Sequence, residues 1–546
     1  MRFISVWSRR LLIGLTIVFY TVVLIAMNQI SAVERQTGIS LDVLSITLFF
    51  GTVALLLLWA IWVLMLSRWR WRSRLGVLAG MLLIPFAFFK LFRPVNSGDA
   101  TIARYEPIWN MPEEVSTDVS ELPDRTVDLT TTTARDFPQF LGPDRDGVIR
   151  SDVDADIDRF AQTKIVWKQP IGRGWSGFSA RNGYAVTMEQ RGEKECVTCY
   201  DLQNGELCWI YEHEARHRDA GNMGRVGPRS TPTIHDGLVY ALGAVGNLVC
   251  LNGADGEVIW QQDLNEILGI ELETVTADDG YDVQYEANTT LAWGRAASPL
   301  VFDDSVMVPG GGPADDVQTL LCFDRATGDL KWSAGDEMIA YGSPVLATVA
   351  ERRQILMTAE SEVLGFDPSD GRVLWRLSRP GSSDSFANTS QVTVVSDNHV
   401  LTSKGYPDGG GELIRLNRDG DNLQPESIWK SERSLKTKLT SPVVRDNLAW
   451  CLSNGFLECA DLTNGKRVWR HRGRFGHGQL LLWNQHLLVH SEFGNLYLFR
   501  AAESAPETSP SVPTVDGVCW NTLCLYGDRV LVRSELEAAC LQIPTR

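Results

Sequence analysis

Residues 213–217 read HEARH, a stretch whose residue types and spacing could bind a catalytic metal ion. On a helix, His213 and His217 would share one face and hold zinc, while Glu214 would activate the metal-bound water for hydrolysis. That chemistry depends on the helix, because the helical turn brings positions i and i+4 close together. The surrounding sequence therefore decides between a hydrolytic site and a chance match.

A second pair with possible chemistry is Cys196 and Cys199, which are separated by two residues. This spacing occurs in redox and metal sites, and it attaches haem where His follows the second cysteine. Tyr200 stands at that position, so the haem motif is excluded. Ten cysteines in 546 residues are also too sparse for a disulfide scaffold.

The composition divides the chain into two unlike parts. About the first 92 residues are strongly apolar, and the remainder is acidic and rich in Gly and Trp. The formal net charge of −16 argues against nucleic-acid binding, which requires a basic surface. The sequence therefore indicates a membrane segment joined to a polar globular part.

Three apolar stretches open the chain, at residues 11–27, 43–66 and 75–92. A helix needs about 20 apolar residues to cross the hydrocarbon core, so we expect residues 1–93 to form a membrane anchor with three spans. Arginines cluster before the first stretch and between the second and third, which favours a cytoplasmic location for both segments. The rest of the chain would then be extracytoplasmic. The alternative, a cleaved N-terminal signal, would also export it.

Residues 94–136 contain Pro, Ser, Thr and acidic residues without a sustained hydrophobic period. Such a composition is typical of a disordered tether. We therefore interpret 94–136 as a linker between the anchor and the globular part.

Five segments in the C-terminal part align without gaps and end in Trp, with Gly four residues earlier. They read CYDLQNGELCW (199–209), CLNGADGEVIW (250–260), CFDRATGDLKW (322–332), GFDPSDGRVLW (365–375) and CADLTNGKRVW (459–469). Asp or Asn followed by Gly favours a turn between two strands. Each segment therefore predicts a β-hairpin whose Trp can wedge between neighbouring sheets.

A second element, with the pattern strand, turn, strand, precedes each hairpin, as in STPTIHDGLVYALG at 230–243. Eight such starts align, so residues 164–546 hold eight four-stranded units of roughly 48 residues, a length typical of propeller blades. The predicted fold class is all-β, an eight-bladed β-propeller of antiparallel blades, preceded by three transmembrane α-helices.

The Trp of the repeat is present seven times, at Trp167, Trp209, Trp260, Trp332, Trp375, Trp429 and Trp469. The last unit ends without an outer strand, whereas KIVW at 164–167 is an outer strand with no unit before it. We expect these two parts to pair, because pairing closes the ring and removes an open sheet edge.

The repeated hairpins, the SP strand starts and the lead-in FPQFLGPDRDGV (137–148) resemble the family of pyrroloquinoline-quinone (PQQ)-like eight-bladed propellers. The resemblance covers roughly residues 135–546, and we assign the propeller domain to residues 137–546. It implies one of two functions, because the family includes BamB, a non-enzymatic scaffold of outer-membrane assembly, and quinoprotein dehydrogenases that bind PQQ and calcium.

The dehydrogenases of this family use an adjacent Cys-Cys pair over the cofactor, and this sequence has none. No single segment indicates a calcium site either, because the Asp and Asn residues fall mostly in the predicted turns. We therefore expect no catalytic residue, no metal site and no cofactor. The alternative is a membrane-bound, PQQ-dependent dehydrogenase of alcohols or sugars.

In the register of the repeats, HEARH follows the outer strand of the first blade, and a Gly-rich connection comes after it. This position favours a strand end over a zinc-binding helix. The cysteines at 199, 250, 322, 459 and 540 share one slot of the repeat, which predicts small buried side chains that lie too far apart to pair.

Loops that enter the inner strands should surround the mouth of the central channel. We predict a binding site there for an anion or a polypeptide, with the alternative that these residues only satisfy backbone groups at the blade ends. The insertion at 261–294 should cover this face and begin with a short helix. A basic rim on one face of the ring could combine the Arg229 loop with His213, Arg216, His217 and Arg218. The candidate mouth residues are Arg229, Arg295, Tyr341, Asn388, Lys438 and His477.

Together these features predict a protein-binding scaffold. We expect the chain to lie in the bacterial inner (cytoplasmic) membrane with its propeller on the periplasmic side. Its expected partners are membrane lipid, through the N-terminal helices, and a protein of the cell envelope, but no nucleic acid.

Overall fold

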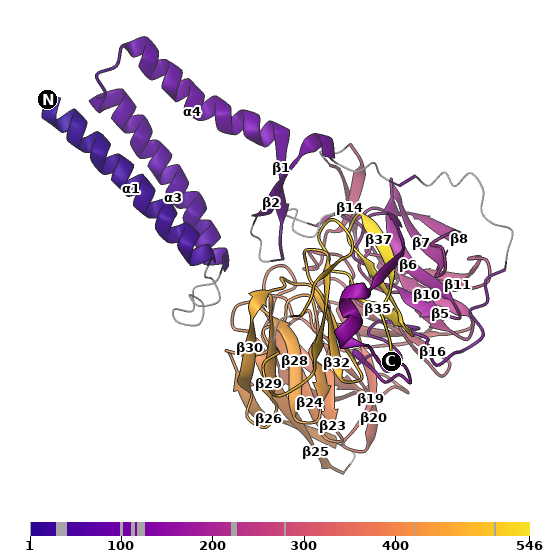
Figure 1. The fold of residues 1–546 in the computed structure, drawn as a ribbon. Helices are drawn as coiled ribbons and strands as arrows, with labels where there is room; N and C mark the ends of the chain where they lie inside the picture. Colours follow the sequence, from indigo (N-terminus) through magenta and orange to yellow (C-terminus); the bar gives the residue numbers. More distant parts are fainter. Residues whose placement is uncertain are drawn as a thin grey trace. The chain divides into compact units, whose positions relative to one another are not determined.

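The chain contains two compact units, Met1–Glu113 and Glu114–Arg546, in a computed structural model (Figure 1). The structure describes residues 2–28, 41–98, 102–110, 115–116, 126–219, 226–277, 280–420, 422–506 and 509–546.

Apolar helices dominate the first unit: α1 (Arg2–Asn28), α3 (Leu41–Ile61) and α4 (Trp71–Leu91). A π-helical turn, η1 (Trp62–Leu66), extends α3. In the described chain, three helices are long and apolar enough to cross a membrane, at Val6–Met27, Ile46–Leu66 and Trp71–Leu91. These ranges match the three predicted apolar stretches.

Polar contacts join α1 and α3, which run side by side in Figure 1. The Tyr20 hydroxyl donates to Thr52 Oγ1 at 3.0 Å, and the Trp59 indole donates to Thr16 Oγ1 at 3.2 Å. Contacts of this kind help to join helices in lipid, where the hydrophobic effect does not drive helix association.

The predicted linker contains more order than its composition indicates. Strands β1 (Phe92–Asn96) and β2 (Ile102–Pro107) form a hairpin in its first part, followed by the 3-10 turn η2 (Ile108–Asn110). In its last part, Val127 and Leu129 are buried in the core of blades 1 and 2. The disordered-linker expectation is therefore wrong for these stretches, because apolar residues within a polar composition still find a core.

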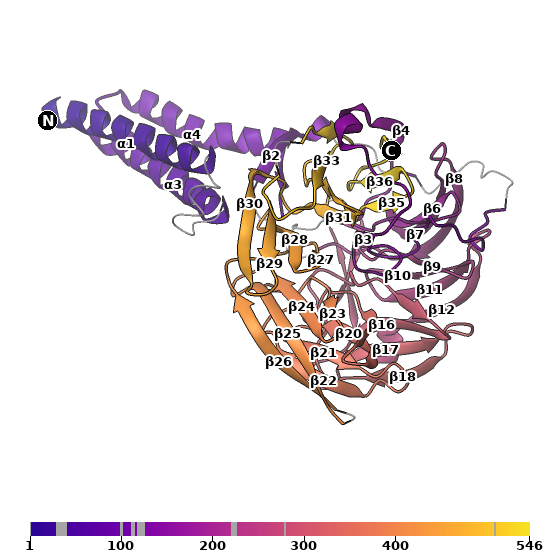
Figure 2. The ribbon, with the colours of Figure 1, turned by 60° about the horizontal axis from the view of Figure 1, so that its bottom comes forward.

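Eight four-stranded blades follow one another around the ring in chain order, as the colour progression in Figure 2 shows. Blade 1 contains β5 (Ser179–Arg181), β6 (Tyr184–Arg191), β7 (Lys194–Asp201) and β8 (Leu207–Glu214); blade 2 contains β9 (Thr233–His235), β10 (Leu238–Leu242), β11 (Asn247–Asn252) and β12 (Val258–Asp263). Blade 3 contains β15 (Leu300–Phe302), β16 (Ser305–Gly311), β17 (Gln318–Asp324) and β18 (Leu330–Ala334); blade 4 contains β19 (Val345–Val349), β20 (Arg352–Thr358), β21 (Glu362–Phe366) and β22 (Val373–Ser378).

The second half of the ring repeats this plan. Blade 5 contains β23 (Thr393–Ser396), β24 (His399–Lys404), β25 (Gly410–Asp419) and β26 (Asn422–Ser431); blade 6 contains β27 (Val443–Arg445), β28 (Leu448–Ser453), β29 (Phe456–Asp461) and β30 (Lys466–Arg474). Blade 7 contains β31 (Gln479–Trp483), β32 (His486–His490), β33 (Asn495–Arg500) and β34 (Val512–Pro513); blade 8 contains β35 (Cys524–Tyr526), β36 (Arg529–Arg533) and β37 (Glu537–Gln542). The predicted eight-bladed propeller is thus confirmed.

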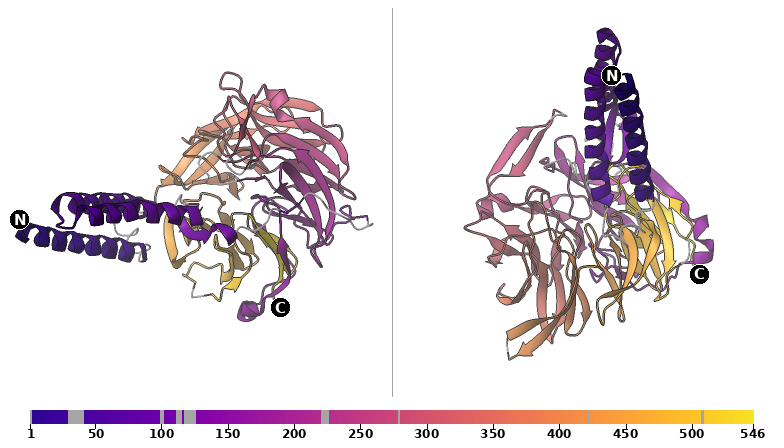
Figure 3. Two further views of the ribbon diagram at one scale, coloured as in Figure 1. Left: turned by 90° about the horizontal axis from the view of Figure 1, so that it is seen from above. Right: turned by 90° about the vertical axis from the view of Figure 1, so that its left-hand side faces the viewer.

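The ring closes as the sequence predicts. Strand β4 (Lys164–Pro170), which precedes blade 1 in the chain, pairs antiparallel with β37 as the outer strand of blade 8. Trp167 lies opposite Cys540 in this pair. The N-terminal strand thereby supplies the outer strand that the last blade lacks (Figure 3).

The spacing of Gly and Trp in the repeat has a packing cause. Each turn Gly has a positive φ, and the Trp of the preceding blade packs against it. A Cβ added to Gly256 would lie 2.7 Å from the Trp209 ring, and one added to Gly328 would lie 2.6 Å from the Trp260 ring. Only Gly satisfies both the backbone conformation and this close approach.

The hydroxyl of the SP motif links neighbouring inner strands. The Thr231 N–H donates to Ser298 Oγ at 2.9 Å, and the Ser298 N–H donates to Ser343 Oγ at 3.0 Å. The lead-in segment contacts the inner strands of two other blades: Phe137 bridges to Ala180 of blade 1, and β3 (Val148–Ile149) pairs parallel with β31 of blade 7.

Candidate functional site

The HEARH stretch lies at the end of a strand, as its register in the repeat predicts. His213 and Glu214 are the last residues of β8, and no helix carries them. His217 is 3% exposed, and its Nδ1 lies 3.2 Å from the Gln284 carbonyl. The geometry needed for a zinc-binding helix is therefore missing from this segment.

The insertion after blade 2 packs on this stretch. It begins with helix α5 (Leu264–Leu268), as predicted, and continues as the hairpin of β13 (Leu272–Thr276) and β14 (Asp282–Glu286). The Arg216 guanidinium lies over the Tyr281 ring at 4.1 Å, and Arg216 is 2% exposed. The predicted basic rim is wrong for Arg216 and His217, because both side chains are buried and contact the insertion.

Two kinds of loop share one end of the propeller, because the strands of a blade alternate in direction. They are the loops from one blade to the next and the loops between the second and third strands of a blade. We call this end the connecting face, and the opposite end, which carries the remaining turns, the turn face. All six predicted mouth residues lie in loops between blades, and each is nearly or fully buried.

Arg295 and Asn388 make contacts within the fold. Arg295 Nε donates to Glu286 Oε1 at 2.9 Å, which attaches the insertion hairpin to the blade 3 side of the ring. Its Nη1 also donates to the Gly310 carbonyl at 2.5 Å. Asn388 Nδ2 donates to the carbonyls of Glu360 and Arg379, each at 2.9 Å. Both side chains satisfy backbone groups at blade ends, the alternative that the sequence left open.

His477 lies apart, in the loop before blade 7. Its backbone N–H donates to Glu492 Oε2 at 3.1 Å, and Glu492 Oε1 accepts from the Trp520 indole at 2.8 Å. The Trp520 ring packs on Trp175 with the ring centroids 4.6 Å apart. This group contacts blades 7, 8 and 1.

Tyr341 and Lys438 do converge, through two aromatic residues that the sequence reasoning missed. The Trp293 ring packs on Tyr341 in a tilted arrangement with the centroids 5.0 Å apart, and it stacks on Tyr406 at 5.8 Å, with interplanar angles of 30° and 28°. The Lys438 ammonium lies 5.4 Å from the centre of the Tyr406 ring, a distance that permits a cation–π contact.

Asp219 and Arg229 form an ion pair beside these rings. Burial raises the pKa of the Tyr406 hydroxyl, and the negative charge of Asp219 raises it further. Burial and Asp219 also raise the pKa of Tyr341. Both phenols therefore stay neutral donors at physiological pH. We define the mouth cluster as Asp219, Arg229, Trp293, Tyr341, Tyr406 and Lys438.

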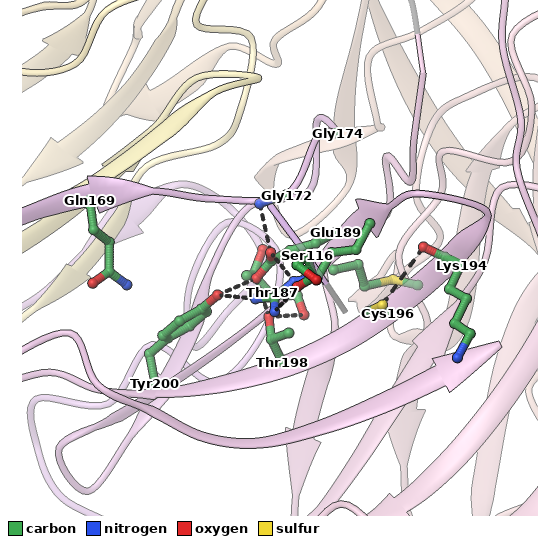
Figure 4. Close-up of polar contacts among 12 residues, drawn as sticks. Ser116, Gln169, Gly172, Gly174, Thr187, Glu189, Lys194, Cys196, Thr198 and Tyr200 are labelled. Atoms are coloured by element: carbon green, nitrogen blue, oxygen red, sulfur yellow. Dashed lines mark hydrogen bonds and ion pairs between the residues drawn. The ribbon is translucent and has the colours of Figure 1, made fainter. Parts of the chain in front are cut away.

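A second polar group surrounds Glu189, which is fully buried at the seam between blades 8 and 1. Its carboxylate accepts hydrogen bonds from the Gly172 N–H at 2.7 Å, from Thr198 Oγ1 at 2.6 Å and from the Tyr200 hydroxyl at 2.5 Å, as Figure 4 shows. Arg191 Nε donates to the same carboxylate at 3.1 Å.

Burial opposes the ionised form of Glu189, but the charges of Arg191 and Arg533 and the donated hydrogen bonds outweigh it, so the pKa is lowered. Both carboxylate oxygens are occupied by protein donors. We therefore interpret this group as a lock on the closed ring. Arg191 Nη1 also donates to the Ser116 carbonyl at 3.3 Å, which attaches the chain before the propeller to the same seam.

The described residues offer little for metal chemistry. In this part of the chain, no three His, Cys, Asp or Glu side chains lie close enough together to hold a metal ion. They do not form the carboxylate-rich site that calcium prefers. The ten cysteines are all buried and unpaired by disulfides.

The chain is similar to known proteins of two kinds, an outer membrane assembly factor and quinohemoprotein alcohol dehydrogenases. The sequence profile of the family described as outer membrane protein assembly factor BamB matches residues 193–471, just over half of the chain. The quinohemoprotein alcohol dehydrogenase ADH IIB of Pseudomonas putida is 22% identical over 44% of this chain. The match covers only 41% of that relative's length.

Two solved structures align with this chain, and the first shares its fold. Quinohemoprotein alcohol dehydrogenase from Comamonas testosteroni aligns with a TM-score of 0.52 and 14% identity, over 75% of this chain and 80% of its own. BamB from Moraxella catarrhalis aligns with a TM-score of 0.46 and 14% identity, over 70% of this chain and all of its own.

Proposed function

Because the chain belongs to the family of the outer membrane protein assembly factor BamB, we propose that it is a membrane-anchored scaffold that binds a protein of the cell envelope. The proposal places the propeller on the periplasmic side of the bacterial inner membrane. It assigns the binding surface to the connecting face around the mouth cluster.

The observation that carries this proposal is the composition of the mouth cluster. Three stacked aromatic rings come from three different loops, with a cation on one side and the Asp219–Arg229 pair nearby. Binding energy at protein interfaces concentrates on Trp, Tyr and Arg held in well-packed positions. The cluster therefore supplies preorganised anchors for a polypeptide.

The anchor supports the proposed location through its arginines. Arg74 Nη1 donates to the Leu64 carbonyl at 2.7 Å, and its Nε donates to the Trp69 carbonyl at 3.1 Å. Leu64 is in the last turn of η1, and a cation at this carbonyl stabilises the end of the helix. Arginines between spans favour the cytoplasmic side. A C-terminal alkaline phosphatase fusion should therefore be active, and a C-terminal green fluorescent protein exported by the same route should be dark.

Photo-crosslinking tests the binding proposal. A benzoylphenylalanine at Tyr406 should give one discrete adduct with an envelope protein in intact cells. The same group at Val258, which begins outer strand β12 at its turn-face end and is 47% exposed, is the control. An identical set of adducts from both positions, or none from Tyr406, would contradict the proposal.

The likeness to quinohemoprotein alcohol dehydrogenases motivates one alternative, a PQQ-dependent oxidoreductase. The described residues present no carboxylate-rich calcium site, so we assign no residue to such chemistry. Full-length protein incubated with PQQ and Ca²⁺ tests it directly. A quinone absorption band together with dye-linked oxidation of an alcohol or sugar would favour the oxidoreductase over the scaffold.

A further inference from the structure

A repeated hydrogen bond joins most neighbouring blades. The indole N–H of a repeat Trp donates to a backbone carbonyl in the following blade. These bonds are Trp167 to Leu202 at 3.1 Å, Trp209 to Gly253 at 3.0 Å, Trp260 to Arg325 at 2.9 Å, Trp429 to Leu462 at 2.7 Å and Trp469 to Ala502 at 3.1 Å. Four of these acceptors directly follow the Asp or Asn that begins the outer turn of their blade.

The acceptor residue is held in place by its own N–H. In those four blades it donates to a carbonyl in the turn between the first and second strands. The bonds are Leu202 to Gly183 at 2.9 Å, Gly253 to Gly237 at 2.9 Å, Arg325 to Asp304 at 3.0 Å and Leu462 to Asn447 at 2.8 Å. One peptide N–H therefore ties two turns together and aims the carbonyl at the Trp of the preceding blade.

Blade 4 has Pro368 at this position, and proline has no N–H to donate. The tie between the two turns is replaced by an ion pair from Arg352 to Asp367. The Trp332 ring of blade 3 still packs on Gly371, since an added Cβ there would lie 2.6 Å from it. Its indole N–H nevertheless makes no hydrogen bond within the described chain.

A cleft of about 660 Å³ lies at this seam, on the turn face between blades 3 and 4. Its volume falls in the range of roughly 300–1,000 Å³ that is typical of ligand sites. The apolar part of its lining is Phe302, Trp332 and Pro368. Every residue that lines the cleft is described by the structure.

The charged groups around the cleft are already paired. Arg353 donates to Asp303 at 2.7 Å across the two blades, and Lys331 lies 2.9 Å from Asp304. Arg353 also lies over the Phe302 ring at 5.1 Å. An occupant therefore needs no net charge, but it needs an acceptor for the indole and an apolar surface for the two rings.

We propose that this cleft binds an extended polypeptide segment of a partner protein, with a backbone carbonyl of the segment accepting from Trp332 Nε1. The missing group is a peptide carbonyl, because a peptide carbonyl fills the equivalent position in five other seams. Phe302 and Trp332 in the cleft lining offer an apolar surface to a proline or aliphatic side chain of the segment. The site is distinct from the mouth cluster, which is on the connecting face, and it does not depend on the proposed function there.

A random octapeptide library displayed on phage, selected on the full-length protein in detergent, tests this site. Selected peptides should bind wild type and lose detectable affinity for Pro368→Leu, because Leu restores the N–H found in blades 1 and 6 and closes the seam. Trp332→Phe keeps the ring but removes the donor, and it should weaken binding roughly 3- to 10-fold, the effect of one neutral hydrogen bond.

Trp209→Phe is the matched control, because its N–H is satisfied inside the protein. It should leave peptide affinity unchanged. The proposal is overturned if no peptide is enriched on wild type relative to Pro368→Leu. It is equally overturned if selected peptides bind Trp332→Phe and Trp209→Phe with wild-type affinity. The second criterion stands even if Pro368→Leu fails to fold.

Discussion

The buried carboxylate of Glu189 gives the sharpest prediction about how the ring is held closed. The substitution Glu189→Ala removes the acceptor of four hydrogen bonds and leaves Arg191 without its carboxylate partner. The Arg191 side chain is 5% exposed and that of Glu189 is 0% exposed, so water cannot replace the lost partner without opening the seam.

Breaking a buried ion pair by removing one partner costs about 3–5 kcal/mol. A buried donor left without an acceptor costs about 1–3 kcal/mol, although the two figures overlap and do not add. We therefore expect Glu189→Ala to lower the free energy of unfolding of the propeller by about 4 kcal/mol. Urea unfolding of the full-length protein, followed by Trp fluorescence, measures this change.

Glu212 on the adjacent strand β8 provides the matched control. It pairs with Lys194 at 2.6 Å, but both side chains are partly exposed, so solvent can replace the interaction. Glu212→Ala should leave the unfolding midpoint close to wild type. Equal midpoints for Glu189→Ala and wild type would refute the interpretation of Glu189 as a structural lock, and would reopen a ligand-binding role.

Three further predictions concern pH and ring closure. Burial lowers the pKa of His490 to about 3, so the folded state does not bind a proton that the unfolded state binds below about pH 6.5. Wild type should therefore lose about 2 kcal/mol of stability between pH 6.5 and pH 5. His490→Gln should lose less over the same range, as urea titrations at the two pH values would show. Burial raises the pKa of Glu195 to about 7, so ionisation of this carboxyl opposes folding as pH rises from about 4.5 to 7. The free energy of unfolding of Glu195→Gln should exceed that of wild type by about 3 kcal/mol at pH 8 and differ little at pH 4. Deleting residues 164–170 removes the outer strand of blade 8 and should expose its edge, which size-exclusion chromatography would detect as aggregation; a monomeric deletion variant with wild-type thermal stability would contradict the closure.

The blades could be predicted from sequence because their cause is local and repeated. Each outer turn requires a residue with positive φ at the Gly position, and the Trp of the preceding blade packs against that Gly, so both residues recur at fixed spacing. The exception in blade 4 was also visible, since Pro368 is the residue that departs from the pattern in GFDPSDG. The structural consequence of Pro368 was not visible in the sequence. The N–H that proline lacks would join two turns of the blade, and those turns position the carbonyl that accepts from the Trp of the preceding blade.

The mouth cluster could be predicted only in part. Tyr341 and Lys438 stand at repeated positions before inner strands, and the sequence therefore named them. Trp293 lies in an insertion and Tyr406 lies in a loop outside the repeat, so only the closed ring brings them together. For Arg295 and Asn388 the sequence left open a role at the blade ends, but it could not identify the carbonyls that they satisfy, because Gly310 and Glu360 lie 15 and 28 residues away.

The most direct test of the account is the affinity of the cross-linked envelope protein, once purified, for the full-length chain in detergent. Lys438→Glu places a negative charge beside the Tyr406 ring, and disrupting a residue that dominates an interface costs about 2 kcal/mol or more, which corresponds to a loss of affinity of roughly 30-fold or greater. Val258→Ala, at the turn-face end of β12, should bind as wild type does. We expect a weakened Lys438→Glu variant beside an unchanged Val258→Ala variant, and equal affinity for all three proteins would contradict the proposed binding surface.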